Sequence, residues 1–461
     1  MRIRSQLVLL ALAAAWLTTV AGAQSQRPPN IVVIVADDMG YADLGVHGSR
    51  DMRTPNIDAL ARESVRFTDA YVSGPYCSPT RAGMLTGRYP QRFGHEFNLS
   101  PEHREFGLPL DETTIADRLK AAGYRTAMFG KWHLGVGEKY HPLQRGFERF
   151  FGFLGGAHTY IAVGNEANPL LDGTARLEKF DGYLTDTLAE RASAYVKQES
   201  SRPFFLYLAF NAAHTPMHAT KKYLDRFPHI QDEQRRTYAA MVSAMDDGIG
   251  KVLSTLREQN LDQNTLVIFF NDNGGPTMAT TSVNGSSNAP LRGSKRTTWE
   301  GGIRVPFVIR WTGRLPAGRV DKRPIIQLDV LPTALAAAGV KTGNSPRLDG
   351  VNLLPFLTGA AKGPPHETLY WRFGGMMAIR HGDWKLVKSR EGAFVDEDPA
   401  VLKDLTGAEL FNLAEDIGET RNQAAARPDK VKELADRWQQ WNKQLVKPRW
   451  SAPQGARGGQ R

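Results

Sequence analysis

Four apolar runs, rich in β-branched residues, recur along the N-terminal part of the chain, and polar residues follow each of them. The runs cover residues 30–36, 124–129, 203–210 and 265–270. Patterns with helical spacing lie between them and predict a helix capped by Thr54 and further helices over 111–122 and 238–259. Buried strands that alternate with helices predict an α/β fold, in which a large, mostly parallel sheet is sandwiched between helices.

From about residue 366 the pattern changes to short strands. These are expected over 369–372, 376–380, 384–387 and 409–413, followed by a helix over 429–445. Trp438 and Trp441 share the apolar face of that helix and are expected in the core. We therefore predict a large domain over 24–365, a smaller C-terminal α+β subdomain of antiparallel strands and a helix over 366–448, and a disordered basic tail over 449–461.

The first residues have the pattern of a signal peptide. Two arginines precede an apolar run over 7–17, and a small-residue cleavage site ends at Ala23. We expect residues 1–23 to be removed and the mature protein to be exported, either to the periplasm or outside the cell. No later stretch reaches the roughly 20 apolar residues that a membrane span needs. An uncleaved membrane anchor is the alternative.

Charge and cysteine content narrow the function. The formal net charge of +10 suits an anionic substrate. The lysines and arginines are scattered, so the sequence gives no support for nucleic-acid binding. Cys77 is the single cysteine and can form no internal disulfide. Its thiol is therefore either an inert core group or a reactive one.

Polar residues suited to bind ions follow the four predicted strands of the large sheet. Because ligands bind beyond the carboxyl ends of strands in such sheets, we expect these residues to form one site. Three carboxylates and one amide oxygen make a hard donor set, which favours calcium or magnesium over zinc. The residues are Asp37 and Asp38, then Lys131 and His133, then His214, and finally Asp272 and Asn273.

The segment around the single cysteine reads Cys77-Ser78-Pro79-Thr80-Arg81, which is a C-x-P-x-R pattern. Together with the Gly-Lys-Trp-His run that ends at His133, and with the segment around Lys295, it resembles the signature of the type I sulfatases. The resemblance covers roughly residues 30–422. It implies an alkaline-phosphatase-like fold and hydrolysis of sulfate esters. It also implies a maturation enzyme that oxidises Cys77 to formylglycine, whose hydrate is the nucleophile.

The resemblance assigns a role to each residue of the site. The ligands of one calcium ion would be Asp37, Asp38, Asp272, Asn273 and the modified residue 77. The catalytic residues would be Cys77, Arg81, Lys131, His133, His214 and Lys295. Among them, the arginine and the two lysines would bind the sulfate, His214 would protonate the leaving group, and His133 would assist the release of sulfate.

The resemblance leaves the substrate-facing segments unassigned. His95, His158 and Arg292 are candidates to contact a sugar, with ordinary loop roles as the alternative. We expect a structural or substrate-edge role for His218, because Pro216 argues against a helical two-histidine metal site. The predicted function is an exported sulfatase acting on sulfated carbohydrate. A phosphonate or phosphodiester hydrolase and a silent sulfoglycan-binding protein are the alternatives.

Overall fold

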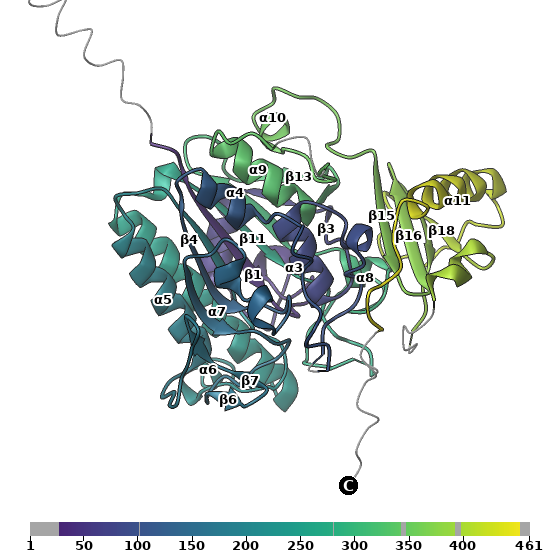
Figure 1. Cartoon of the computed structure of the whole chain (residues 1–461). Coiled ribbons are helices and arrows are strands. Elements are labelled where there is room, and N and C mark those ends of the chain that lie inside the picture. Colours follow the sequence, from purple (N-terminus) through teal and green to yellow (C-terminus); the bar gives the residue numbers. More distant parts are fainter. Residues whose placement is uncertain (1–26, 101, 280, 343–346, 392–397, 452–461) are drawn as a thin grey trace, which may run out of the picture.

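The computed structural model describes residues 27–100, 102–279, 281–342, 347–391 and 398–451, so the predicted signal peptide lies outside the described residues. Its main element is a 10-stranded sheet with the order β13-β2-β12-β11-β1-β10-β4-β5-β8-β9 (Figure 1). The strands are β1 (Asn30–Ala36), β2 (Val65–Phe67), β4 (Arg125–Lys131), β5 (Arg149–Phe153), β8 (Leu171–Asp172), β9 (Ala175–Arg176), β10 (Phe204–Ala209), β11 (Thr265–Asn271), β12 (Phe307–Trp311) and β13 (Arg319–Asp321).

The centre of this sheet is parallel, as predicted. Strands β11, β1, β10, β4 and β5 run in the same direction, and they include the four strands read from the apolar runs. The flanks differ, because β12 pairs with β11, β2 with β12, and β8 with β5 in antiparallel fashion. The sheet is therefore mixed, and its parallel centre brings the carboxyl ends of the four predicted strands to one edge.

Side chains of β1 alternate between two apolar cores, one on each face of the sheet. Val32 and Ile34 pack against α2, α5 and α7, whereas Ile31 and Val33 pack against α3, α4 and α9. The sheet is thus covered by helices on both faces, which is why its central strands are fully buried. The helices are α2 (Pro55–Arg62), α3 (Cys77–Thr86), α4 (Ile115–Ala121), α5 (Leu184–Gln198), α7 (Glu233–Glu258) and α9 (Val330–Ala337). Among the described residues, no helix combines the length and apolarity that a membrane crossing requires.

A second sheet forms the C-terminal part of the molecule (Figure 1). Its four strands are antiparallel in the order β15-β16-β17-β18, and helix α11 packs on them through Trp438 and Trp441, as predicted. The same core includes Tyr71 and Ile303, so the two parts share an apolar interface. The elements are β15 (Thr368–Phe373), β16 (Met376–His381), β17 (Trp384–Lys388), β18 (Glu409–Asn412) and α11 (Pro428–Asn442).

After α11 the chain returns to the large domain as a C-terminal strap, residues 446–450. Val446 N donates to Gln91 O, Arg449 N donates to Gly94 O, and the Trp450 ring is buried against Phe97. The prediction of a disordered tail is therefore wrong at Arg449 and Trp450. It rested on the basic, Gly-rich composition and overlooked the apolar contact that Trp450 makes. The rest of that tail, 452–461, lies outside the described residues.

Candidate active site

The acidic strand ends meet beyond the sheet edge. Asp37 and Asp38 follow β1, and Asp272 and Asn273 follow the adjacent strand β11. Ligand atoms of the three aspartates and of Cys77 all lie within 4.8 Å of one another. The structure thus brings together the acidic residues that the sequence predicted as one cluster.

Cys77 is the first residue of α3, with Pro79 two positions later in the first turn. The thiol is completely buried and donates to Asp37 Oδ1 at 3.6 Å. Burial raises the pKa of the Cys77 thiol to about 12, and the field of nearby Lys131 and Lys295 only partly opposes this shift. A cysteine in this place is therefore a neutral thiol at physiological pH and a poor nucleophile.

Three cations neutralise the three aspartates. Lys131 Nζ lies 2.5 Å from Asp37 Oδ2, and Lys295 Nζ lies 2.7 Å from Asp38. The third cation is Arg81. Its guanidinium donates to Asp272 Oδ2 from Nε at 3.1 Å and from Nη2 at 2.8 Å.

Two of the aspartates have displaced pKa values in opposite directions. Burial and the negative charge of Asp37 raise the pKa of Asp272 to about 6. Burial acts in the same sense on Asp38, but the positive charge of Lys295, together with His214 and Lys131, outweighs it and lowers the pKa of Asp38 to about 2. Asp38 is thus ionised at neutral pH, whereas Asp272 is ionised there with less margin.

The donor set fits a hard divalent cation. Asn273 Nδ2 donates to Asp38 Oδ1 at 2.7 Å, which turns the amide oxygen Oδ1 the other way. That oxygen is buried and accepts no hydrogen bond within the described part of the chain. The three clustered carboxylates, with the Asn273 amide in contact with Asp38, offer oxygen ligands of the kind that calcium or magnesium prefers.

His133 is held as one tautomer. Its Nε2 lies 3.1 Å from the carbonyl oxygen of Leu99 and must carry the proton, because a carbonyl can only accept. Nδ1 is buried without a partner among the described residues. Burial and the neighbouring charges of Lys131 and Arg81 hold the pKa of His133 well below its usual range. His133 is therefore neutral and offers a lone pair.

His214 lies on the other side of the cluster. Its Nδ1 is 2.6 Å from Thr215 O, and its Nε2 is 3.5 Å from Asp38 Oδ2. Tyr160, which sequence reasoning missed, donates to the carbonyl of His214 at 2.8 Å and fixes the segment. Burial and the charge of Lys131 lower the pKa of His214 to about 3, although Asp38 acts in the opposite direction.

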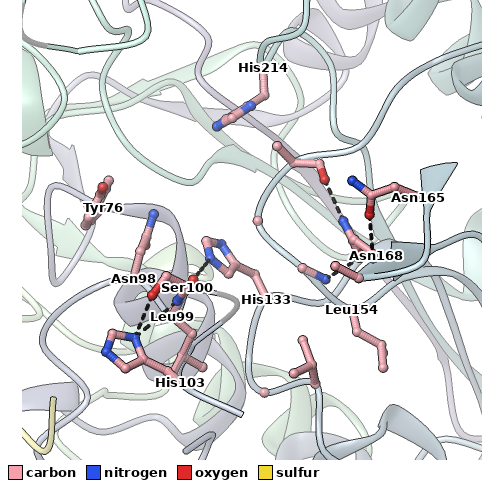
Figure 2. A pocket seen from close by; sticks show the side chains of 16 residues that line it. Tyr76, Asn98, Leu99, Ser100, His103, His133, Leu154, Asn165, Asn168 and His214 are labelled. Atoms are coloured by element: carbon pink, nitrogen blue, oxygen red, sulfur yellow. Dashed lines mark hydrogen bonds between the residues drawn. The ribbon is translucent and has the colours of Figure 1, made fainter. Parts of the chain in front are cut away.

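A pocket of about 380 Å³ opens beside these two histidines (Figure 2). The three residues predicted to contact a sugar do not line it. His95 is buried against Ser78 Oγ, His158 stacks on Phe153, and Arg292 pairs with Glu409. Each of these side chains has a partner within the protein, which agrees with the alternative of ordinary loop roles, and contact with a sugar stays a prediction.

The pocket is lined instead by side chains that no motif had marked. Asn98, Ser100 and His103 come from the loop that precedes α4, and Asn165 and Asn168 come from the hairpin of β6 (Gly164–Asn165) and β7 (Asn168–Pro169). His218 is not among the lining residues and contacts Thr159 Oγ1, which agrees with a structural role. Polar loop residues without periodicity carry no signal that a single sequence can reveal.

Comparison with known proteins decides the family. The family model described as Sulfatase matches residues 29–340. The chain belongs to the sulfatase family. It is accordingly a sulfuric ester hydrolase, as the C-x-P-x-R pattern had indicated.

Relatives of known activity cover most of this sulfatase. N-acetylgalactosamine-6-sulfatase of Canis lupus familiaris is 35% identical over 401 residues, which are 82% of this chain and 74% of the relative. Human arylsulfatase A is 34% identical over 450 residues, covering 88% and 85%. The crystal structure of Ps i-CgsB superposes with a TM-score of 0.84 at 36% identity, covering 92% of this chain and 95% of that one. A second structure shows Ps i-CgsB in complex with k-i-k-neocarrahexaose.

Proposed function

We propose that this sulfatase is exported and removes sulfate from sulfated carbohydrate. Two kinds of observation support the substrate class. The pocket beside His133 and His214 combines amide, hydroxyl and imidazole groups, which suit sugar hydroxyls, with small and apolar residues that suit the carbon faces of a sugar ring. The relatives include a sulfatase named for an aminosugar sulfate and a structure solved with an oligosaccharide.

The mechanism we propose depends on modification of Cys77. A thiol with a pKa of about 12 is a weak nucleophile, so the native side chain is ill suited to the reaction. Once a maturation enzyme has oxidised Cys77 to formylglycine, the hydrated aldehyde supplies the attacking oxygen and a second hydroxyl for the later collapse. The start of α3 supports this placement, because the positive end of the helix dipole lies at residue 77 and favours an anion there.

The charged residues would stabilise the sulfate. Asp37, Asp38, Asp272, Asn273 and residue 77 would hold one calcium ion, which supplies positive charge to the sulfate oxygens. Arg81, Lys131 and Lys295 would bind the remaining oxygens. Their burial in fixed ion pairs means that the charges are preorganised before substrate arrives, and preorganised charge usually lowers the reaction barrier more than any other single effect.

The two histidines would move protons. His214 is neutral in the free protein, and an anionic sulfate in the pocket would favour its protonated form, which can then donate from Nε2 to the leaving oxygen. His133 has an unpaired Nδ1 and would accept a proton during the collapse that releases sulfate. Distinct partners for the two rings support distinct roles.

The two alternative functions have weaker support. A phosphonate monoester hydrolase matches with a TM-score of 0.64 at 19% identity, a likeness that shows the fold alone. A silent sulfoglycan-binding protein would need no proton donor, yet His133 is buried and His214, which is 13% exposed, has a ring nitrogen within 4.8 Å of the Cys77 sulfur. We therefore favour the sulfatase reaction on a glycan.

A panel of sulfated mono- and oligosaccharides tests the proposal. The mature protein, produced with a formylglycine-generating enzyme, should release sulfate from at least one sulfated sugar, measured by ion chromatography. Cys77→Ala should release none and controls for contaminating activity. Turnover of a phosphonate or phosphodiester above that of every sulfate ester would contradict the proposal.

A further inference from the structure

The pocket contains one fixed donor that the mechanism above does not use, the amide nitrogen of Asn98. Asn98 is 8% exposed, and its Oδ1 accepts from Ser78 N at 2.9 Å. Because a backbone N–H can only donate, this bond fixes which end of the amide faces α3. Nδ2 is therefore turned toward the open part of the pocket, between Tyr76 and His133 (Figure 2), and has no acceptor among the described residues.

The backbone on both sides of Asn98 is held by bonds from distant parts of the chain. Trp450 Nε1 lies 3.2 Å from both Phe97 O and Asn98 O, and the Trp450 ring packs edge-on to His95 at 4.7 Å. The carbonyl of Leu99 accepts from His133 at 3.1 Å. The Asn98 amide is thus preorganised, so a ligand that binds it orders little additional structure.

The rest of the pocket indicates what this donor binds. Its lining, within the described residues, contains no Asp, Glu, Lys or Arg. Asn168 already uses its amide on Gly155 N and Ala157 O. A second sulfate or carboxylate would find no full cation there, whereas a sugar hydroxyl needs only neutral donors and acceptors.

We propose that Asn98 Nδ2 donates a hydrogen bond to an oxygen of the sugar ring that carries the sulfate, which makes Asn98 a specificity-determining residue. This inference rests on the proposed function, because it needs a carbohydrate leaving group. Under this proposal, the part of the pocket around Asn98 recognises the sugar, whereas the charged cluster of Asp, Arg and Lys residues binds the sulfate.

Two substitutions separate the two ends of the amide. Asn98→Asp keeps the acceptor for Ser78 N but removes the donor, and Asn98→Ala removes both. For each variant, kcat/KM is measured on the best sulfated sugar of the panel and on nitrophenyl sulfate. The nitrophenyl group carries no hydroxyl other than the esterified oxygen. Added charge or a weakened start of α3 affects both substrates, so it cancels in the ratio of the two values.

The ratio of sugar sulfate to nitrophenyl sulfate should fall about 10-fold in both variants. An unchanged ratio, including equal losses on both substrates, would overturn the inference and place Asn98 in sulfate binding or in folding. A wild-type protein that hydrolyses nitrophenyl sulfate but no sulfated sugar would overturn the proposed function, and with it this inference, before any variant is made.

Discussion

Lys131 Nζ lies 2.5 Å from Asp37 Oδ2, and neither side chain is exposed. This pair belongs to a network of buried ion pairs between acidic strand ends and basic side chains, which also includes Lys295–Asp38 and the pairs of Arg81 with Asp272 and Asp37. In a buried cluster with balanced charges, the loss of one member leaves a charge unpaired in a medium of low polarity. A substitution in this cluster can therefore lower activity by destabilising the fold, so each one is compared with a matched substitution elsewhere in the chain.

Loss of Asp272 should abolish both metal binding and turnover. Asp272→Asn keeps the side-chain shape but removes one of three carboxylates, so bound calcium should disappear and kcat/KM should fall more than about 100-fold. Elemental analysis of dialysed protein measures the metal. Asp181→Asn, at an exposed position, should retain calcium and activity. Stoichiometric zinc without calcium or magnesium in the wild type would contradict the predicted site.

Residue 77 should carry an aldehyde in active protein. Trypsin should release the peptide 67–81, because no lysine or arginine lies between Arg66 and Arg81. Mass spectrometry should detect formylglycine in this peptide, in proportion to specific activity. In folded protein that still carries the thiol, iodoacetamide should label Cys77 only slowly, since the side chain is buried and neutral. Full activity with an unmodified thiol would refute the mechanism.

The role of His214 should depend on the leaving group. A proton donor contributes about 100- to 10,000-fold when the departing alcohol is a poor leaving group, and much less when it departs readily. His214→Ala should therefore reduce hydrolysis of a sugar sulfate far more than that of nitrophenyl sulfate. His218→Ala, four residues away, should show no such difference. Equal losses on both substrates would make His133 the first alternative donor.

The stability of the protein should depend on pH through His366. Its Nε2 lies 2.7 Å from Asp329 Oδ1, and although burial opposes the charge, the Asp329 carboxylate raises the pKa of His366 in the folded state. The ion pair therefore stabilises the fold fully below the unfolded pKa of about 6.5, and this contribution is lost as pH rises through the folded pKa. His366→Gln should lower the free energy of unfolding by about 2 kcal/mol at acidic pH and by less at alkaline pH. Urea titrations at two pH values measure the difference, and an equal loss at both would rule out this pair.

The indole N–H of Trp450 should matter for the sugar rather than for the sulfate. Trp450→Phe keeps an aromatic ring but removes the donor to Phe97 O and Asn98 O, so KM for a sulfated sugar should rise several-fold while nitrophenyl sulfate turnover changes little. Trp438→Phe is the matched control, because it removes a similar bond to Trp371 O, and neither residue lines the pocket. Steady-state kinetics on both substrates distinguish the variants. If Trp450→Phe and Trp438→Phe raised KM for the sulfated sugar equally, the cause would be a general loss of stability rather than the lost contact at Asn98.

The sequence predicted those parts of the molecule that have a regular pattern. The apolar run of β1 matched its strand to the residue, and Asp37, Asp38, Asp272 and Asn273 came together because the strands before them lie side by side in a parallel sheet. Helix boundaries were less accurate. Helix α4 begins at Ile115 rather than at 111, because Thr114 and Asp117 form a capping box. A local hydrogen-bond pair thus set a boundary that hydrophobic spacing could not.

The substrate pocket could not be predicted in the same way. His95 and His158 were chosen for their chemistry, but their rings are held by Ser78 and by Phe153 and Thr159. Asn98 contributes to the pocket because a helix N-terminus orients its amide and a residue near the C-terminus holds its backbone. Both relationships join positions far apart along the chain. A single sequence carries no periodicity that could report them.

The C-terminal strap also imposes an order on assembly. During synthesis the large sheet, helix α3 and the loop that carries Asn98 leave the ribosome well before Trp450 does. The acidic cluster can therefore form early, whereas the wall that faces the sugar stays unfinished until the last sheet has folded and the strap has returned to it. The proposed sugar contact at Asn98 thus depends on a segment that the ribosome adds hundreds of residues after Cys77.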